Sequence, residues 1–334
     1  MNDADPSASQ AMPLATVVIP LYNKGKWVAR AIDSVLRQTW QHLELIIVDD
    51  GSRDNGPEIL TRYGDPRLRL IRQANQGPGA ARNKGWRNGN GEIVAFLDAD
   101  DYWEPGFLEW GINTLRQHPQ IGACTSACLE LNGDGPPVDS SGNRRRLDLP
   151  SGLFRITPET PLRRVRSVLT HMFPVCTVVR RGVLERFGGF YDADLCTYGE
   201  DSFLWLRVLL NYTVYLSAQP HVVVDRTASS LSTLETLETR SLEPILGAPE
   251  EIRQVCPPEL RGLLSTLLAD KALKRCCTLS AVGKWREAAR LRNRFIVPGA
   301  WRLRYGWASL LVVNPVGGTA ATALLRILRR ARAA

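Results

Sequence analysis

Four short apolar runs that alternate with helical patterns are the feature that most constrains the fold of this chain. The runs "LATVVIPLYN", "LELIIVDDGS", "LRLIRQ" and "EIVAFL" have the length and the β-branched content of buried strands. Between them, "KWVARAIDSVLRQ" repeats apolar residues at helical spacing, and helices are also expected at residues 58–63 and in "GAARNKGWRNG". This alternation predicts an α/β fold with a doubly wound, mostly parallel sheet.

Polar residues follow three of these strands at the point where each strand ends. The three segments are Pro20 to Asn23, Asp49 to Ser52 and Asp98 to Asp101. Ligands of open α/β sheets bind outside the carboxyl ends of the strands. We therefore expect a binding site where these three segments meet.

Three carboxylates, those of Asp98, Asp100 and Asp101, come directly after the fourth strand. Two like charges about 4 Å apart repel by ~4 kcal/mol at the effective dielectric of a protein surface. A divalent cation is the simplest means of offsetting that repulsion. Because side chains two apart on a strand point the same way, Asp98 and Asp100 are expected to reach one ligand together.

An acidic pair, Glu200 and Asp201, opens a further apolar helical pattern in "YGEDSFLWLRVLLN". A carboxylate at a helix N-terminus is held in place and kept ionised by the helix dipole. The pair is therefore a candidate general base, and simple capping of the helix is the alternative.

Residue composition and the pattern of apolar residues divide the chain into three parts. Residues 1–14 are polar, which predicts a short disordered leader and not a secretory signal. Residues 15–232 contain the alternating strands and helices. Residues 233–334 are dominated by helical patterns, among them "PELRGLLSTLLADKALKRCCTLSAV" and "KWREAARLRNRF", and predict a helical C-terminal module.

The charge and the cysteines narrow the class of partner. A formal net charge of +8 suits nucleic acid, anionic membranes or phosphorylated small molecules. The basic clusters lack the interleaved aromatic residues of RNA-binding proteins, so no nucleic-acid partner is expected. The seven cysteines form no CxxC motif and are expected to be thiols in a reducing compartment, which favours the cytoplasm.

Phosphate-binding patterns are present only in a loose form. "NQGPGAARNKG" fits neither GxGxxG nor GxxxxGK[ST], which argues against a dinucleotide-dependent oxidoreductase. A glycine-rich start to a helix that carries Arg82 can still face a pyrophosphate group.

Four motifs in order, "TVVIPLYNKGKWVARAIDSVLRQTW", "LELIIVDDGSRD", "NQGPGAARNKG" and "EIVAFLDADDYWEP", resemble glycosyltransferase family 2, which has the GT-A fold. The resemblance is strong over residues 16–107 and resumes in "VVRRGVLERFGGFYDADLCTYGEDSFLWLRV". It implies an inverting enzyme that uses a nucleotide-diphosphate sugar donor and a divalent cation, Mg²⁺ or Mn²⁺. The positions that match the motifs receive expected roles: Pro20, Tyr22 and Asn23 at the nucleoside, Asp50 at the base edge, Arg82 at the nucleotide, Asp98 at the ribose or a metal-bound water, Asp100 at the metal, and Asp201 as catalytic base with Glu200 beside it.

Elementary chemistry agrees with these implied roles. A metal ion that bridges the phosphates neutralises charge as a nucleoside diphosphate leaves, and inversion requires a base on the opposite side to accept the acceptor's proton. The chain departs from the family where members often carry a histidine, because Ala228 stands at about that position. No third protein ligand for a metal is therefore expected there. A sugar-nucleotide-binding protein without catalysis is the alternative function.

The C-terminal tail suggests where such an enzyme acts. Residues 305–325 carry no charge and lie between arginines, and the stretch is long enough to span ~30 Å as a helix. Asn314, Pro315, Gly317 and Gly318 interrupt it, which favours two amphipathic pieces at a membrane interface. This predicts a peripheral membrane enzyme at the inner face of the plasma membrane, with a lipid-linked or cell-envelope glycan as acceptor, as in polysaccharide biosynthesis. Packing of the tail on the catalytic domain or on a second subunit of a homo-oligomer is the alternative.

Overall fold

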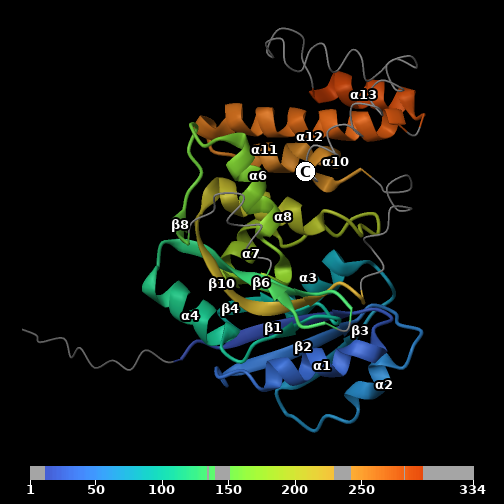
Figure 1. The fold of residues 1–334 in the computed structure, drawn as a ribbon, viewed down its shortest axis with the longest axis vertical. Helices are drawn as coiled ribbons and strands as arrows, with labels where there is room; N and C mark the ends of the chain where they lie inside the picture. Colours follow the sequence, from blue (N-terminus) through green and yellow to red (C-terminus); the bar gives the residue numbers. More distant parts are fainter. Residues whose placement is uncertain (1–11, 134, 140–150, 229–241, 282, 296–334) are drawn as a thin grey trace, which may run out of the picture. The chain divides into compact units, whose positions relative to one another are not determined.

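The computed structural model describes residues 12–133, 135–139, 151–228, 242–281 and 283–295. Its N-terminal part alternates strands and helices along the chain (Figure 1). These elements are β1 (Ala15–Leu21), α1 (Gly25–Leu36), β2 (Leu43–Asp49), α2 (Gly56–Leu60), β3 (Leu68–Arg72), α3 (Pro78–Asn88) and β4 (Ile93–Phe96).

The elements that follow continue the same sheet and cover it. They are β5 (Tyr102–Trp103), α4 (Phe107–Gln117), β6 (Ile121–Leu131), β7 (Val138–Asp139), β8 (Gly152–Phe154), α6 (Leu162–His171), the 3₁₀ turn η1 (Pro174–Cys176), β9 (Thr177–Arg180), α7 (Arg181–Phe187), α8 (Glu200–Asn211) and β10 (Thr213–Asp225).

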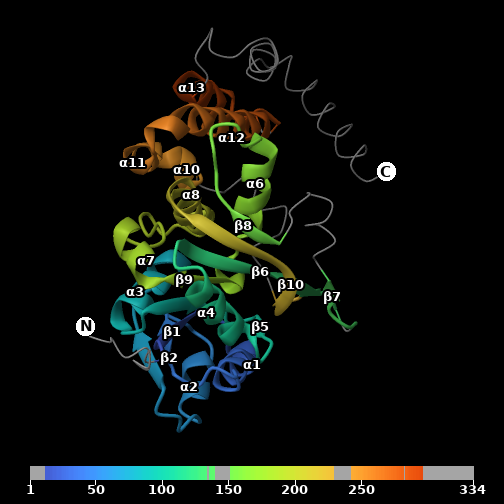
Figure 2. The same cartoon turned by 90° about the vertical axis from the view of Figure 1, so that its left-hand side faces the viewer.

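The strands of the described residues form one ten-stranded sheet. Eight of them follow the path β3-β2-β1-β4-β9-β6-β10-β5, while β7 pairs with β6 and β8 pairs with β10. β1 is parallel to both β2 and β4, and β2 is parallel to β3. β6 and β10 form a second, long parallel pair (Figure 2). Antiparallel β9 lies between the two parallel groups. The predicted α/β fold with a doubly wound, mostly parallel sheet is confirmed, and the antiparallel β9 is an addition to the predicted pattern.

The two faces of the sheet pack into different cores, because successive strand side chains point to opposite faces. Ile19 and Leu45 belong to a core that includes the apolar faces of α1 and α4. Val18, one residue along from Ile19, faces α3, and Phe96 packs edge-on against Phe190. Because helices cover both faces of the sheet, the carboxyl ends of the parallel strands are the side of the sheet that these helices leave open. We call this side the carboxyl edge.

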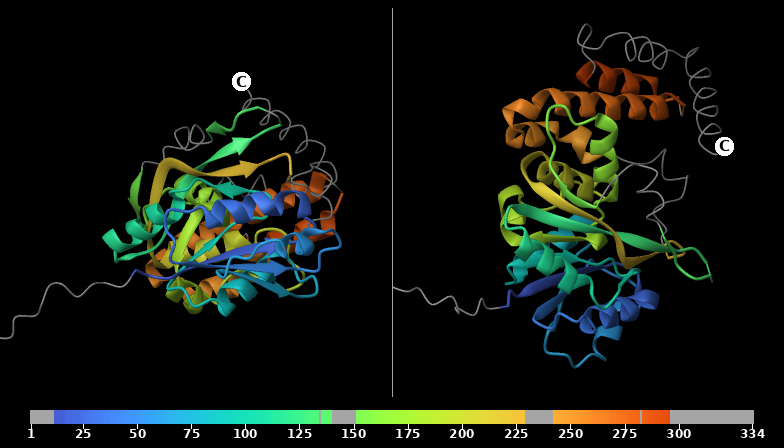
Figure 3. Two further views of the ribbon diagram at one scale, coloured as in Figure 1. Left: turned by 90° about the horizontal axis from the view of Figure 1, so that it is seen from below. Right: turned by 60° about the vertical axis from the view of Figure 1, so that its left-hand side comes forward.

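Contacts divide the chain into two compact units, Met1–Ile156 with Arg164–Ser229, and Thr157–Arg163 with Ser230–Ala334. The described helices of the second unit confirm the predicted helical character of the C-terminal part. In the right-hand view of Figure 3, α12 and α13 run side by side. The elements are α10 (Pro244–Gly247), α11 (Pro249–Val255), the 3₁₀ turn η2 (Pro258–Leu260), α12 (Arg261–Ala281) and α13 (Trp285–Phe295).

Several expectations fall outside the described residues. They are the domain boundary between residues 232 and 233, residues 1–11 of the predicted leader, and the tail from residue 296 onward with its expected amphipathic helices. Within the part of the chain that the structure describes, no helix is both long enough and apolar enough to cross a membrane.

Candidate functional site

The polar segments after β1 and β2 are tied together at the carboxyl edge of the sheet. Asn23 adopts a left-handed conformation with φ 51°, which asparagine tolerates better than most residues. Its Oδ1 accepts a hydrogen bond from the Arg53 backbone N–H at 2.8 Å, and its own N–H donates to Ser52 Oγ at 3.1 Å. Pro20 is the residue before the last in β1, and Tyr22 is exposed beside Asn23. The exposed Tyr22 can therefore line a site at this edge, while the Oδ1 of Asn23 already ties the two segments together.

Asp50, the residue expected at the base of the donor, is buried in this edge. Its Oδ1 accepts hydrogen bonds from the Gln73 side chain and the Gln76 N–H, each at 2.8 Å. Its Oδ2 accepts one from the Gly77 N–H at 2.9 Å. The carboxylate therefore fixes the segment that leads from β3 into α3, a structural role that the sequence did not indicate.

Arg82 connects two parts of the site that are distant in sequence. Its guanidinium donates to Asp98 Oδ1 at 2.7 Å and to Glu200 Oε1 at 2.9 Å, and it lies over the Phe190 ring. The side chain is buried, and burial alone would lower its pKa. The charges of Asp98 and Glu200 outweigh burial and raise the pKa of Arg82 above its usual value. Arg82 thus brings the end of β4 and the start of α8 to one place.

Gly79 is what allows α3 to carry Arg82 so close to α8. A Cβ atom at this position would lie 2.3 Å from the Tyr191 carbonyl oxygen and 3.2 Å from Glu200 Cγ. Any larger residue would push α3 away from the segment before α8. The glycine-rich pattern of the sequence therefore serves a close approach between chain segments in this structure.

Glu200 and Asp201 begin α8, after Gly199 in a left-handed conformation. Burial, and then the charge of Asp201, raise the pKa of Glu200 to about 7, although Arg82 opposes the shift. Burial also raises the pKa of Asp201, whose Oδ1 accepts a hydrogen bond from the Ser202 N–H at 2.6 Å. In the described part of the chain Arg82 pairs with Glu200, whereas Asp201 forms no ion pair.

The three carboxylates after β4 are stabilised in three different ways. Asp98 pairs with Arg82, and Asp100 Oδ2 accepts a hydrogen bond from Lys24 Nζ at 2.6 Å. Asp101 is buried, and burial, followed by the charges of its two aspartate neighbours, raises its pKa well above the ordinary value. The sequence predicts a divalent cation as the offsetting charge and does not show that Arg82 and Lys24, two cations of the chain itself, also pair with Asp98 and Asp100.

Sequence reasoning missed Lys24, Arg30 and Asp225 at this edge. Lys24 Nζ also donates to the Ala228 carbonyl at 2.6 Å. Arg30 donates to the Asp100 carbonyl at 2.6 Å and to Asp225 Oδ2 at 2.8 Å. Lys24 directly follows the polar segment after β1, but only the pairing of β1 with β4 shows that it meets Asp100.

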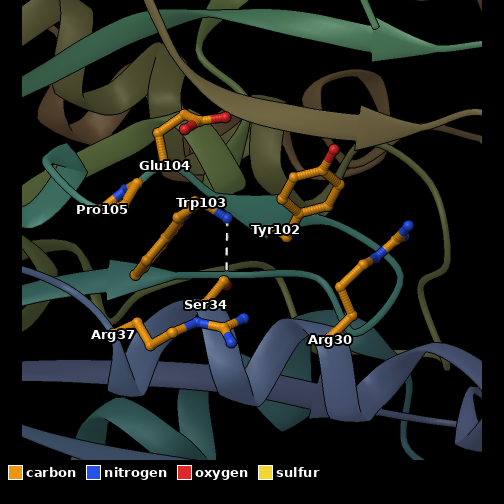
Figure 4. Close-up of a pocket in the computed structure, with 7 residues that line it drawn as sticks. All are labelled: Arg30, Ser34, Arg37, Tyr102, Trp103, Glu104 and Pro105. Carbon is orange, nitrogen blue, oxygen red and sulfur yellow. Dashed lines mark hydrogen bonds between the residues drawn. The ribbon is translucent and has the colours of Figure 1, made fainter. Parts of the chain in front are cut away.

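A cavity of about 260 Å³ lies near this edge but is a different site (Figure 4). It is bordered by residues of α1 and of the segment from β5 onward, and the Trp103 N–H donates to Ser34 Oγ across it at 3.2 Å. No residue expected at the donor site or as the catalytic base lines it. The lining residues are Arg30, Ser34, Arg37, Tyr102, Trp103, Glu104 and Pro105.

The site offers few protein ligands for a metal ion. Among the described residues, no three histidine, cysteine, aspartate or glutamate side chains converge in a way that would hold one. Asp100 nevertheless already binds a cation, the Lys24 ammonium, with a hard oxygen ligand of the kind that Mg²⁺ and Mn²⁺ prefer. Because Mg²⁺ at such sites is held by one or two carboxylates together with substrate phosphates, the residues present fit a metal that arrives with a diphosphate.

Curated relatives match part of the chain. An uncharacterised glycosyltransferase of Nostoc sp. is 34% identical over 172 residues, which cover 48% of this chain and 53% of that protein. The putative glycosyltransferase EpsH of Bacillus subtilis is 36% identical over 130 residues, or 38% of each chain. The match thus spans about half or less of the length of these relatives.

Solved structures share the fold over most of the chain. S. aureus TarS 1-349 in complex with UDP-GlcNAc superposes with a TM-score of 0.57 at 17% identity, over 90% of both chains. The mannosyltransferase PcManGT from Pyrobaculum calidifontis, in complex with GDP-Man and Mn²⁺, gives a TM-score of 0.54 at 19% identity, over 94% of this chain and 87% of that one. These likenesses establish the GT-A fold.

Residues 16–188, more than half of the 334, match the family model described as Glycosyl transferase family 2. The match includes the three polar strand ends and the helix that carries Arg82. This chain belongs to glycosyl transferase family 2.

Proposed function

We propose that this protein transfers a sugar from a nucleotide-diphosphate donor to a hydroxyl group of an acceptor, with inversion at the anomeric carbon. The observation that carries the proposal is the bridge from Arg82 to Asp98 and Glu200. The bridge joins the acidic segment after β4 to the acidic start of α8. One site therefore holds carboxylates that can face the nucleotide-sugar donor and a carboxylate that can act as the base. The nucleotide sugars bound by the TarS and mannosyltransferase structures support the same substrate class.

The donor is proposed to lie along the carboxyl edge of the sheet. Pro20, Tyr22 and Asn23 would border the nucleoside, and Asp50 would face the base while it holds the segment before α3. Asp98 is proposed to contact the ribose or a metal-bound water. Arg82 would act near the nucleotide chiefly by orienting Asp98, since the two carboxylates already engage its guanidinium.

The proposed cofactor is Mg²⁺ or Mn²⁺, held by Asp100 together with the donor diphosphate. When bound, the ion would neutralise negative charge on the departing nucleoside diphosphate. The chain's own contribution is to keep Asp100 at the end of β4, where Lys24 and the Arg30 contact to the Asp100 carbonyl fix its position.

Asp201 is the proposed base, with Glu200 as its orienting neighbour. An inverting displacement needs a carboxylate that removes the proton from the acceptor hydroxyl as the new bond forms. Glu200 forms an ion pair with Arg82, whereas Asp201 forms no ion pair with any described residue. The raised pKa of Asp201 makes it a stronger base than an ordinary aspartate.

The substrate class is tested with a panel of nucleotide sugars, screened by thermal shift with and without Mn²⁺. A ligand at a hundred times its Kd should stabilise the protein by ~2.7 kcal/mol. If none of the nucleotide sugars shifts the melting temperature, the proposal fails.

Catalysis is then tested with the donor that the panel identifies. Asp201→Asn should keep the thermal shift and lose transfer by about 10²–10⁴-fold. Glu185→Gln, on the exposed face of α7, is the matched control and should react as the wild type does. Donor binding without turnover in any of the three proteins would favour the alternative of a non-catalytic sugar-nucleotide-binding protein.

The acceptor is proposed to be a lipid-linked or cell-envelope glycan, on the basis of the tail sequence alone. Arg302 and Arg304 precede the uncharged stretch 305–325, and further arginines follow it. Flotation with anionic vesicles at low salt should recover the full chain, but not a truncation that ends at residue 296. Equal recovery of the full chain and of the truncation in the soluble fraction would contradict the proposed binding of the tail to a membrane.

A further inference from the structure

The ammonium of Lys24 sits in a cage of cation-binding groups at the end of β4. Its Nζ lies 2.6 Å from Asp100 Oδ2 and 2.6 Å from the Ala228 carbonyl oxygen. The Trp27 ring completes the cage, with its centroid 5.2 Å from Nζ. The side chains of Lys24 and Asp100 are only 21% and 15% exposed. Three segments of the chain therefore converge on one positive charge.

The cage offers the ligands that a divalent ion would use. A carboxylate and a backbone carbonyl are hard oxygen ligands, which Mg²⁺ and Mn²⁺ prefer. A lysine ammonium is a compact point charge on a flexible stem, so it can fill such a position and also leave it. Two cations a few ångströms apart repel each other, and the repulsion from a divalent ion is twice that from a monovalent one. Without further negative charge nearby, an ion on Asp100 and the ammonium in its cage therefore disfavour each other.

We propose that Lys24 occupies the cation position on Asp100 in the free protein and competes with the divalent ion for that carboxylate. The competition weakens binding of a metal ion on its own. The next step rests on the proposed function. The donor diphosphate brings the negative charge that allows both cations to remain, so the metal ion and the donor bind together. The simpler alternative is a salt bridge that only ties the start of α1 to the end of β4, without any effect on metal affinity.

The test measures Mn²⁺ binding to the full chain without any donor, from the electron paramagnetic resonance signal of free Mn²⁺. Lys24→Met removes the charge and keeps most of the stem, and it should bind Mn²⁺ at least about tenfold more tightly than the wild type. Lys24→Arg keeps the charge and should bind as weakly as the wild type. Lys24→Met combined with Asp100→Asn should lose the gain.

Equal Mn²⁺ affinity in Lys24→Met and wild type would overturn the proposal, and so would a gain that survives Asp100→Asn. Lys24→Gln, which retains a donor for the Ala228 carbonyl, repeats the measurement if the methionine variant does not fold. A second series adds UDP or GDP, which should raise the Mn²⁺ affinity of the wild type by about tenfold or more. If neither nucleotide does so while Lys24→Met still binds Mn²⁺ tightly, the competition stands and the proposed donor class is wrong.

Discussion

Replacement of Arg82 by methionine should destabilise the protein by about 3 kcal/mol at pH 7. The substitution keeps a long apolar side chain but removes the positive charge between Asp98 and Glu200. Breaking a buried ion pair by removing one partner costs about 3–5 kcal/mol, because a buried charge is left uncompensated. We expect the lower end of this range, since Asp98 is about one-third exposed and Glu200 can take up a proton.

The loss should depend on pH with a definite sign. The pKa of Glu200 is raised from 4.5 to about 7, so the native state binds more protons than the unfolded state between these values. Arg82 lowers that pKa, and its removal should raise it further. If the pKa of Glu200 rises by one further unit, the unfolding free energy falls by about 1.4 kcal/mol at pH values above that pKa. The difference in unfolding free energy between wild type and Arg82→Met should therefore be larger at pH 8 than at pH 6.

Urea denaturation at pH 6, 7 and 8, followed by tryptophan fluorescence, measures these differences. Adding Glu200→Gln to Arg82→Met removes the unpaired carboxylate and should recover about half of the loss or more. Arg87→Met is the matched control, because the Arg87–Asp192 pair is solvent-exposed at 3.8 Å and should contribute about 1 kcal/mol or less. The reasoning is refuted if Arg82→Met costs no more than the control at any pH, or if Glu200→Gln recovers nothing.

Three further outcomes are expected. Gly85→Ala should lower the unfolding free energy by about 1–3 kcal/mol, because its Cβ would lie 2.2 Å from Val18 Cγ1. The control Gly182→Ala on α7 places its Cβ in open space and should not lower the unfolding free energy. Equal urea midpoints for the two variants would contradict this packing. Burial raises the pKa of Asp101, so this carboxyl should make the wild type less stable as pH rises above the ordinary aspartate range, and Asp101→Asn should flatten that dependence in urea denaturation. The raised pKa of Asp201 should place the acid limb of the pH–rate profile above the ordinary aspartate range, and a limb within that range would argue against Asp201 as base.

Much of the fold was predictable from the sequence because strand and helix patterns are local. The alternation of β1 to β4 with their helices follows from periodicity, and the parallel order follows from the general behaviour of such units. The same argument predicted polar residues after β1, β2 and β4 at one edge, because the carboxyl ends of neighbouring parallel strands meet there. The antiparallel direction of β9 was not predictable in this way, since its pairing with β4 and β6 depends on contacts between residues far apart in the chain.

The electrostatics of the site were decided only by the tertiary structure. Asp98, Asp100 and Asp101 look equivalent in sequence, yet each has a different partner or environment. Asp100 meets Lys24 across 76 residues, and Arg82 meets Glu200 across 118. The residue types that carry the proposed chemistry are visible in the sequence. Which cation each carboxylate meets, and in which direction its pKa shifts, depends on burial and on charges a few ångströms away, and long-range packing sets both.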